Sequence, residues 1–381
     1  MTHSKNLIHK IIIFTTLLLV STLMQAKYLD TKSCAECHDM IHYEHKNSMH
    51  HKSSLFSDEF HRKIKNLTTP EKYDCAICHT PGAKNLRALM TGKEQPNSNI
   101  KEEQDGVSCF YCHQITKVLE TKHRNINFYS YKGEKKPTFF GNLKNVRDSN
   151  EHEQSSNEIY KNSQVCMGCH GKKYNKHKVE ICNGYDEFDK TSDCIKCHMP
   201  KENGGPTKKN VKGRTQYASH EFLGIRNDDM VKKAVTLKLK QLEDNSVELT
   251  IKNKMGHDII MQPMRLKYVE TTVKRSDNII WKNYNKLPSE DTLATFTRLF
   301  KDDKGHRVFP PSATGVLFDN NIKANSTKKI IYNIPKLQKG DVIKSQWISY
   351  VLRPSLARSL KIDDKEVTKK YLGYSVSIVI K

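Results

Sequence analysis

Ten of the eleven cysteines in this 381-residue chain form five pairs, and all five pairs have the same spacing and the same following residue. Two residues separate the cysteines of a pair, and a histidine directly follows the second cysteine. The motifs are Cys34, Cys37 and His38; Cys75, Cys78 and His79; Cys109, Cys112 and His113; Cys166, Cys169 and His170; and Cys194, Cys197 and His198. C-x-x-C-H is the attachment signature of c-type haem, in which both thiols bond to the haem and the histidine binds the iron. The sequence therefore predicts five covalently bound haem c groups.

Other uses of paired cysteines fit less well. Structural zinc needs four ligands per ion, which an odd number of pairs, each followed by histidine, does not supply. Thioredoxin-like chemistry needs one pair at a helix start. Five two-residue disulfide loops would serve no structural purpose, although an oxidising compartment would allow them.

The five motifs are dense along the chain. They lie between Cys34 and His198, about one per 33 residues, which is far below the size of an ordinary domain. So little protein per haem cannot isolate the rings from one another, and we expect the haems themselves to form the core. Closely spaced irons in such a core would conduct electrons.

The first 26 residues have the pattern of an export signal. Lys5 and Lys10 precede a short apolar stretch, and Ala26 offers a small residue for cleavage. We expect a signal peptide at residues 1–26 and a periplasmic mature protein; an uncleaved anchor helix is the alternative. A mean hydropathy of −0.71 excludes a polytopic membrane protein.

Eleven histidines after residue 26 lie outside the motifs, more than the five that could serve as sixth iron ligands. They are His42, His45, His50, His51, His61, His123, His152, His177, His220, His257 and His306. Eight of them lie between residues 30 and 180, which indicates mostly bis-histidine ligation.

Several stretches resemble multihaem cytochromes c of the superfamily that includes the nitrifiers' tetrahaem cytochrome, octahaem hydroxylamine oxidoreductase and pentahaem nitrite reductase. The similar stretches are the first motif followed by Ser48-Met49-His50, Gly106-Val107-Ser108-Cys109, His152 ahead of Cys166, Asn175-Lys176-His177 ahead of Cys182, Cys197-His198-Met199-Pro200, and His220-Glu221-Phe222-Leu223-Gly224. Together they cover residues 30–225.

The resemblance implies distal ligands at His50, His152 and His220. It implies His61 and His177 for the remaining two haems, with His123 in reserve. Some members of this superfamily leave one haem open for chemistry. A C-x-x-C-Lys motif, which marks the catalytic haem of the pentahaem nitrite reductase, is absent from the sequence, which argues against ammonia-forming nitrite reduction.

After Pro200 the composition changes. Alternating apolar residues from Val235 to Ile251, broken at Asp244 and Asn245, predict a β-hairpin. Further strands are expected at 266–273, 279–281, 329–334, 341–352 and 374–380. The chain is therefore predicted to be α + β, with a mainly helical or irregular pentahaem domain at 27–227 and an antiparallel β-sandwich domain at 228–381. This second region also resembles the β-rich C-terminal module of some multihaem cytochromes around His257, although the family's following Pro-Thr-Gly is absent.

Charge is divided unevenly between the two regions. Residues 27–227 carry a formal charge of +8 and residues 228–381 carry +12, and each ferric haem c adds about −1 through its propionates. The basic excess would attract redox proteins that are acidic at the contact, or bring the protein to an anionic membrane surface. Alternatively, the lysines form an ordinary solvated surface with no partner. Nucleic acid is not expected as a partner of a soluble exported protein.

Three function classes remain open. The first is an electron-relaying pentahaem cytochrome. The second is a multihaem oxidoreductase acting on a small nitrogen or sulfur compound at one open haem. The third is a haem wire with ligands shared between subunits, so the oligomeric state also stays open.

The motif count gives the first prediction. The purified mature protein should carry five haems in the pyridine haemochrome assay, and its intact mass should equal residues 27–381 plus five haems. Three or fewer haems per chain would contradict the interpretation of the motifs.

Overall fold

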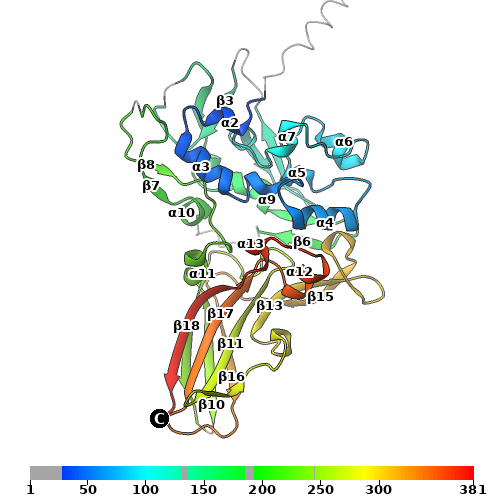
Figure 1. Ribbon diagram of the computed structural model, residues 1–381. Helices are drawn as coiled ribbons and strands as arrows, with labels where there is room; N and C mark the ends of the chain where they lie inside the picture. The colour runs from blue at the N-terminus through cyan, green and yellow to red at the C-terminus, as the bar shows by residue number, and fades with distance from the viewer. Residues whose placement is uncertain (1–27, 131–135, 147, 185–192, 211, 244) are drawn as a thin grey trace, which may run out of the picture.

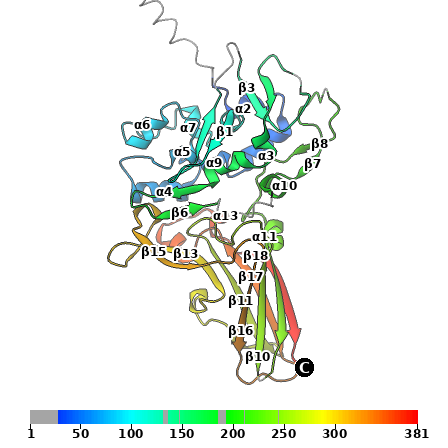
Figure 2. The ribbon, with the colours of Figure 1, turned by 180° about the vertical axis from the view of Figure 1, so that it is seen from behind.

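The computed structural model describes residues 28–130, 136–146, 148–184, 193–210, 212–243 and 245–381. The predicted signal peptide lies outside these residues, as does Asp244. Figures 1 and 2 show two parts, one above the other: residues 28–227, here the motif part, and residues 228–381, here the sheet part. No helix in the described residues is long and apolar enough to cross a membrane.

The motif part is built from short helices and two-stranded sheets (Figure 1). Its helices are α2 (Thr31–Cys34), α3 (Asp39–Asn47), α4 (Glu59–Thr68), α5 (Ala76–His79), α6 (Leu86–Thr91), α7 (Lys101–Gln104), α8 (Cys109–Cys112), α9 (Met167–His170) and α10 (Cys194–His198). Its strands pair as β1 (Ile115–Leu119) with β2 (Ile126–Tyr129), β3 (Thr138–Gly141) with β4 (Glu153–Ser156), β5 (Lys172–Tyr174) with β6 (Glu180–Asn183), and β7 (Lys201–Asn203) with β8 (Gln216–Ala218). The β3–β4 pair is parallel and the other three are antiparallel.

The sheet part follows α11 (Asp228–Ala234) and consists of two antiparallel sheets. The smaller sheet has the order β16 (Thr327–Asn333), β10 (Ser246–Asn253), β9 (Val235–Gln241). The larger sheet contains β11 (Leu266–Arg275), β12 (Asn278–Lys282), β13 (Thr295–Lys301), β14 (Arg307–Val308), β15 (Gly315–Asn320), β17 (Val342–Tyr350) and β18 (Tyr371–Val379). Two short helices, α12 (Pro354–Ser359) and α13 (Lys365–Thr368), lie between β17 and β18 in the chain.

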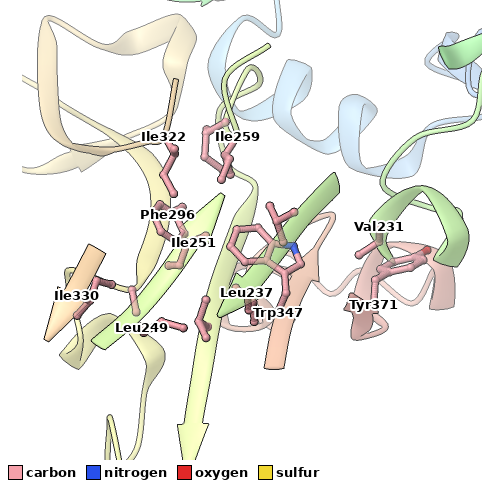
Figure 3. Packing of buried hydrophobic residues seen from close by; sticks show 14 of the residues in the cluster. Val231, Leu237, Leu249, Ile251, Ile259, Phe296, Ile322, Ile330, Trp347 and Tyr371 are labelled. Atoms are coloured by element: carbon pink, nitrogen blue, oxygen red, sulfur yellow. The ribbon is translucent and has the colours of Figure 1, made fainter. Parts of the chain in front are cut away.

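One hydrophobic core joins the two sheets. Leu237, Leu249 and Ile330 come from the smaller sheet, and Phe296 and Trp347 come from the larger sheet. Figure 3 shows these side chains packed together, and each is at most 4% exposed. The alternation of buried and accessible residues along β9 and β10 is the period-2 pattern that predicted the hairpin. The α + β prediction is thus confirmed, with antiparallel sheets in the C-terminal region.

Strands β13 and β15 were not predicted. The first four residues of β13 are all buried, but three of them, Thr295, Thr297 and Arg298, are polar, so the polarity of the sequence does not mark the buried positions. In β15 the exposed residues Val316 and Leu317 are both apolar, which again removes the signal.

Hydrogen bonds join the two parts of the molecule. The Asn175 Nδ2 donates to the carbonyl oxygens of Pro310 and Ala313, at 2.8 and 2.7 Å. The Lys63 Nζ donates to the carbonyl oxygen of Lys361 at 2.6 Å. Phe60 of α4 also packs against the core of the sheet part.

Two adjacent positions on β16 provide a matched test of this core. Ile330 is 3% exposed and faces the core, whereas Ile331 is 58% exposed. Ile330→Ala should lower the free energy of unfolding by about 2–5 kcal/mol, because it removes buried methyl groups and leaves a cavity. Ile331→Ala should change it by less than about 0.5 kcal/mol. Denaturant unfolding followed by far-UV circular dichroism would measure both, and equal effects would contradict the assignment of faces.

Candidate haem-binding site

Each motif lies in or beside a single short turn of helix. The helices concerned are α2, α5, α8, α9 and α10. Positions i, i+3 and i+4 share one helix face, so one turn presents both cysteines and the histidine to the same side. Asp30, Ser108 and Asp193 cap three of these turns by accepting a hydrogen bond from a backbone N–H in the first turn.

Backbone carbonyls fix the orientation of four motif histidines. His38 Nδ1 donates to Pro206 at 2.7 Å, His79 Nδ1 to Ser53 at 3.1 Å, His113 Nδ1 to Phe140 at 2.7 Å, and His198 Nδ1 to Leu223 at 2.5 Å. A metal-binding histidine typically donates its second ring N–H in this way, which fixes the tautomer and leaves the other nitrogen for the metal. These four motif histidines are therefore oriented to bind a metal through Nε2.

Four of the five motif histidines face a second histidine across nearly the same distance. The ring centroids are 6.3 Å apart for His38 and His152, 6.1 Å for His170 and His50, 6.2 Å for His113 and His220, and 6.4 Å for His198 and His257. Two imidazoles on opposite sides of one metal ion, with metal–nitrogen bonds of about 2.0–2.1 Å, have centroids about 6.2–6.4 Å apart. The four separations therefore fit an iron ion between the rings.

The second histidines are also oriented and kept neutral. His220 Nδ1 donates to the carbonyl of Ala218 at 2.8 Å, and His257 Nδ1 donates to that of Asp258 at 2.7 Å. Burial lowers the pKa of His220 to about 3 and that of His257 to about 4. It also lowers the pKa of His50 to about 3. Each ring is therefore neutral at pH 7, the form that binds a metal.

A buried carboxylate holds the loop that carries His220. Glu44 of α3 is 7% exposed, and its Oε2 accepts from the backbone N–H of His220 at 2.8 Å. Its Oε1 accepts from the Tyr217 hydroxyl at 2.7 Å. These two bonds link α3, which follows the first motif, to the ring that faces His113.

The motif at Cys75 differs from the other four. The ring of His61, on α4, lies only 3.7 Å from that of His79, at an angle of 50°. This separation is too short for a metal ion between the rings. On the other side of this motif, the Lys173 Nζ lies 2.9 Å from the Cys78 Sγ.

The structure places four of the predicted distal histidines beside motif histidines. His50, His152 and His220 each lie opposite a motif histidine, and His61 lies beside His79. His177 is exposed and has no ring contact with a motif histidine in the described residues, and His123 is also exposed and contacts Tyr174.

The place opposite His198 is taken by His257, from the sheet part, to which the sequence assigned no role. The available signal was the similarity around Asn253 and His257. Asn253 is fully buried, and its Nδ2 donates to the carbonyl of His257 at 2.9 Å.

The motifs contact one another through their thiols. Cys34 lies beside Cys109, Cys78 beside Cys169, and Cys166 beside Cys194. All five motifs therefore lie against a neighbouring motif, although up to 91 residues separate the partners in the chain.

Comparisons with known proteins agree with this geometry. Residues 33–114, which contain the first three motifs, match the family model described as cytochrome c554 and c-prime. No curated protein sequence matches the chain significantly. Among solved structures, the chain is similar to a penta-heme cytochrome c552 from Thermochromatium tepidum, with 21% identity, a TM-score of 0.75, and coverage of 92% of this chain and 99% of that one.

A superoxide reductase in the oxidized state also matches, over 39% of this chain and 89% of that one, with 8% identity. Its TM-score of 0.19 carries no structural argument. The family match and the shared fold support the class of multihaem c-type cytochromes with covalently bound haem.

Replacing the second histidines tests the pairing. His152→Ala, His220→Ala and His257→Ala should each convert one low-spin ferric haem to high spin without loss of covalent haem, because the thioether bonds and the motif histidine keep the ring in place. Electron paramagnetic resonance (EPR) of the oxidised protein would show this.

Two variants serve as controls for these substitutions. His306 lies in the sheet part, exposed beside Asp302, and His177 is also exposed. His306→Ala and His177→Ala should leave the spin state of every haem as it is in the unmodified protein. A new high-spin signal in His177→Ala, together with none in His257→Ala, would contradict the pairing.

Proposed function

We propose that this chain is an exported pentahaem c-type cytochrome that relays electrons, and that four of its five haems are held between two histidines. The observation that carries the proposal is the set of four histidine pairs at 6.1–6.4 Å, each containing one motif histidine. The pairs are His38–His152, His113–His220, His170–His50 and His198–His257. In this proposal His257 takes the ligand role that the family resemblance implied for His177.

Bound haem supplies one-electron redox chemistry. The two cysteines of each motif would hold the haem through their sulfurs, and the two histidines of each pair would ligate its iron. Both histidines would then exclude water from the iron, and four of the haems would have no site for substrate. This is the arrangement expected of an electron carrier.

The thiol contacts support a relay path. Cys34 lies beside Cys109 and Cys166 lies beside Cys194, and Cys112 lies near Cys169. The first, third, fourth and fifth motifs thus form a row, and the second motif joins the row through Cys78 and Cys169. Cys37 and Cys197, in the two end motifs, are exposed, which places the haem edges at the ends of the row near solvent for exchange with partners.

The proposed location is the periplasm, where acidic redox proteins are the expected partners. The support is the export pattern at residues 1–26 and the +12 charge of residues 228–381. Membership of the superfamily of the nitrifiers' tetrahaem cytochrome and hydroxylamine oxidoreductase is part of the same proposal.

A second candidate function rests on the motif at Cys75. His61 lies too close to His79 to share an iron with it in this arrangement. Lys173 supplies an amine beside Cys78 that could orient an anion. An iron on His79 with an open sixth position would make the protein an oxidoreductase for a small nitrogen or sulfur compound.

EPR of the oxidised wild-type protein distinguishes the two candidates. Five low-spin haems support the carrier, and His61→Ala should then create one high-spin haem because it removes the sixth ligand of the His79 iron. A high-spin signal of about one haem in the wild type, altered by nitrite or hydroxylamine and unchanged by His61→Ala, would overturn the carrier in favour of the enzyme.

A further inference from the structure

Lys267 has an unusual position for a cation. It lies on β11, where it pairs with Phe296 and Ser349 on the neighbouring strands. Side chains alternate between faces along a strand, so Lys267 shares the face of Val269 and Val273, two residues of the hydrophobic core. A charged amine on a core face is costly unless it has partners.

Arg265, two residues earlier, lies on the same side. Its Nη1 donates to the carbonyl of Val351 at 2.7 Å, and its Nη2 donates to the Gln262 side chain at 3.1 Å. The Nζ of Lys267 donates to the carbonyl of Ile259 at 2.7 Å. All three acceptors are neutral, and no carboxylate among the described residues lies within salt-bridge distance of either cation.

Four other cations of the sheet part are paired. Arg275 binds Asp341, Lys282 binds Glu270, Arg298 binds Asp319 and Lys323 binds Asp258, all at 2.7–2.8 Å. Against the effect of burial, the charge of Asp58 acts to raise the pKa of Arg265, but no ion pair joins the two residues, and the Asp58 carboxylate caps α4 by accepting from the His61 N–H at 2.9 Å. Among the described residues, Arg265 and Lys267 therefore form a cation pair that no carboxylate contacts.

The position of the pair indicates what the anion is. Ile259, which Lys267 contacts, is two residues beyond His257, the residue opposite His198. Burial lowers the pKa of Lys267 to about 7, and a neighbouring anion would reverse this shift. The pair is thus close to one proposed haem, and each haem c carries two propionate carboxylates.

We propose that Lys267 and Arg265 form a carboxylate-binding site at the boundary of the two parts, and that its ligand is a propionate of the haem between His198 and His257. This inference rests on the proposed function, because it requires a haem at that histidine pair. The same chemistry would bind a free carboxylate from solution, which is the competing source of the anion.

The test uses holoprotein variants of Lys267. Lys267→Gln keeps a donor for the Ile259 carbonyl and removes the charge, whereas Lys267→Met removes both. A nearby cation favours the reduced haem, which carries one positive charge fewer than the oxidised haem. Both variants should therefore lower the equilibrium constant for reducing this haem about tenfold, which lowers its reduction potential by about 59 mV for one electron. An EPR-monitored redox titration would measure the potential. The low-spin signal of this haem is the one that disappears in His257→Ala.

Lys328→Met is the matched control. Lys328 is also a partly buried lysine of the sheet part with a neutral acceptor, the Asn320 side chain at 2.7 Å. Its replacement should leave the potential unchanged.

A second arm of the test separates the two sources of the anion. If a propionate occupies the site, replacing sodium chloride by sodium acetate at equal ionic strength should leave the wild-type potential unchanged. A fall in potential with rising acetate in the wild type, absent from both Lys267 variants, would overturn the propionate assignment in favour of a free carboxylate.

Other results would also overturn the site. An unchanged potential in Lys267→Gln, with a shift only in Lys267→Met, would mean that Lys267 acts through its hydrogen bond. Unchanged potentials in both variants, with five haems and the His257-dependent signal intact, would overturn the site and leave the proposed function standing. A wild type without that signal would overturn both.

Discussion

The pairing of histidines across 6.1–6.4 Å is the constraint on which the motif part depends. This part has little hydrophobic core of its own. Among the described residues, its two clusters contain six and five buried residues, whereas the larger of the two clusters in the sheet part contains 25. Protein regions with so small a core are usually stabilised by disulfides, metals or cofactors. The short helices and two-stranded sheets of this part position cysteine sulfurs and histidine rings and do not build a large hydrophobic core.

Those groups are positioned by local chemistry. One turn of helix places two cysteines and a histidine on one side, and backbone carbonyls orient the histidine rings. The buried Glu44 connects the helix after the first motif to the loop of His220. Each histidine pair therefore brings together segments that are distant in the chain.

The sequence predicted the local elements of this site better than the distant ones. The five motifs and the strand pattern of β9 and β10 are short-range signals, and the structure contains both. Which histidine faces which motif depends on tertiary packing, which residue spacing does not encode. His177 follows a motif closely and is exposed, whereas His257 lies 59 residues beyond His198 and in another part of the molecule. Strand β13 was missed for a related reason, since Thr295, Thr297 and Arg298 are polar residues that tertiary packing buries.

The sheet part contributes a residue to the candidate haem-binding site. It supplies His257, and it holds that residue rigidly through Asn253, whose side chain bonds three backbone carbonyls. Asp258, the next residue, is 1% exposed and bonds Lys323. The loop is thus anchored on both sides of the ligand, and its geometry is set by the folded sheets.

The position of His257 has a consequence for how the protein is assembled. If haem binds as proposed, its attachment at Cys194 and Cys197 needs only the local motif. The proposed sixth ligand, His257, lies 59 residues beyond His198 and would take its place only once the two sheets have packed. The coordination state of this haem would then report whether the C-terminal half has folded, and a truncated or misfolded chain would keep a reactive iron at the surface between the two parts.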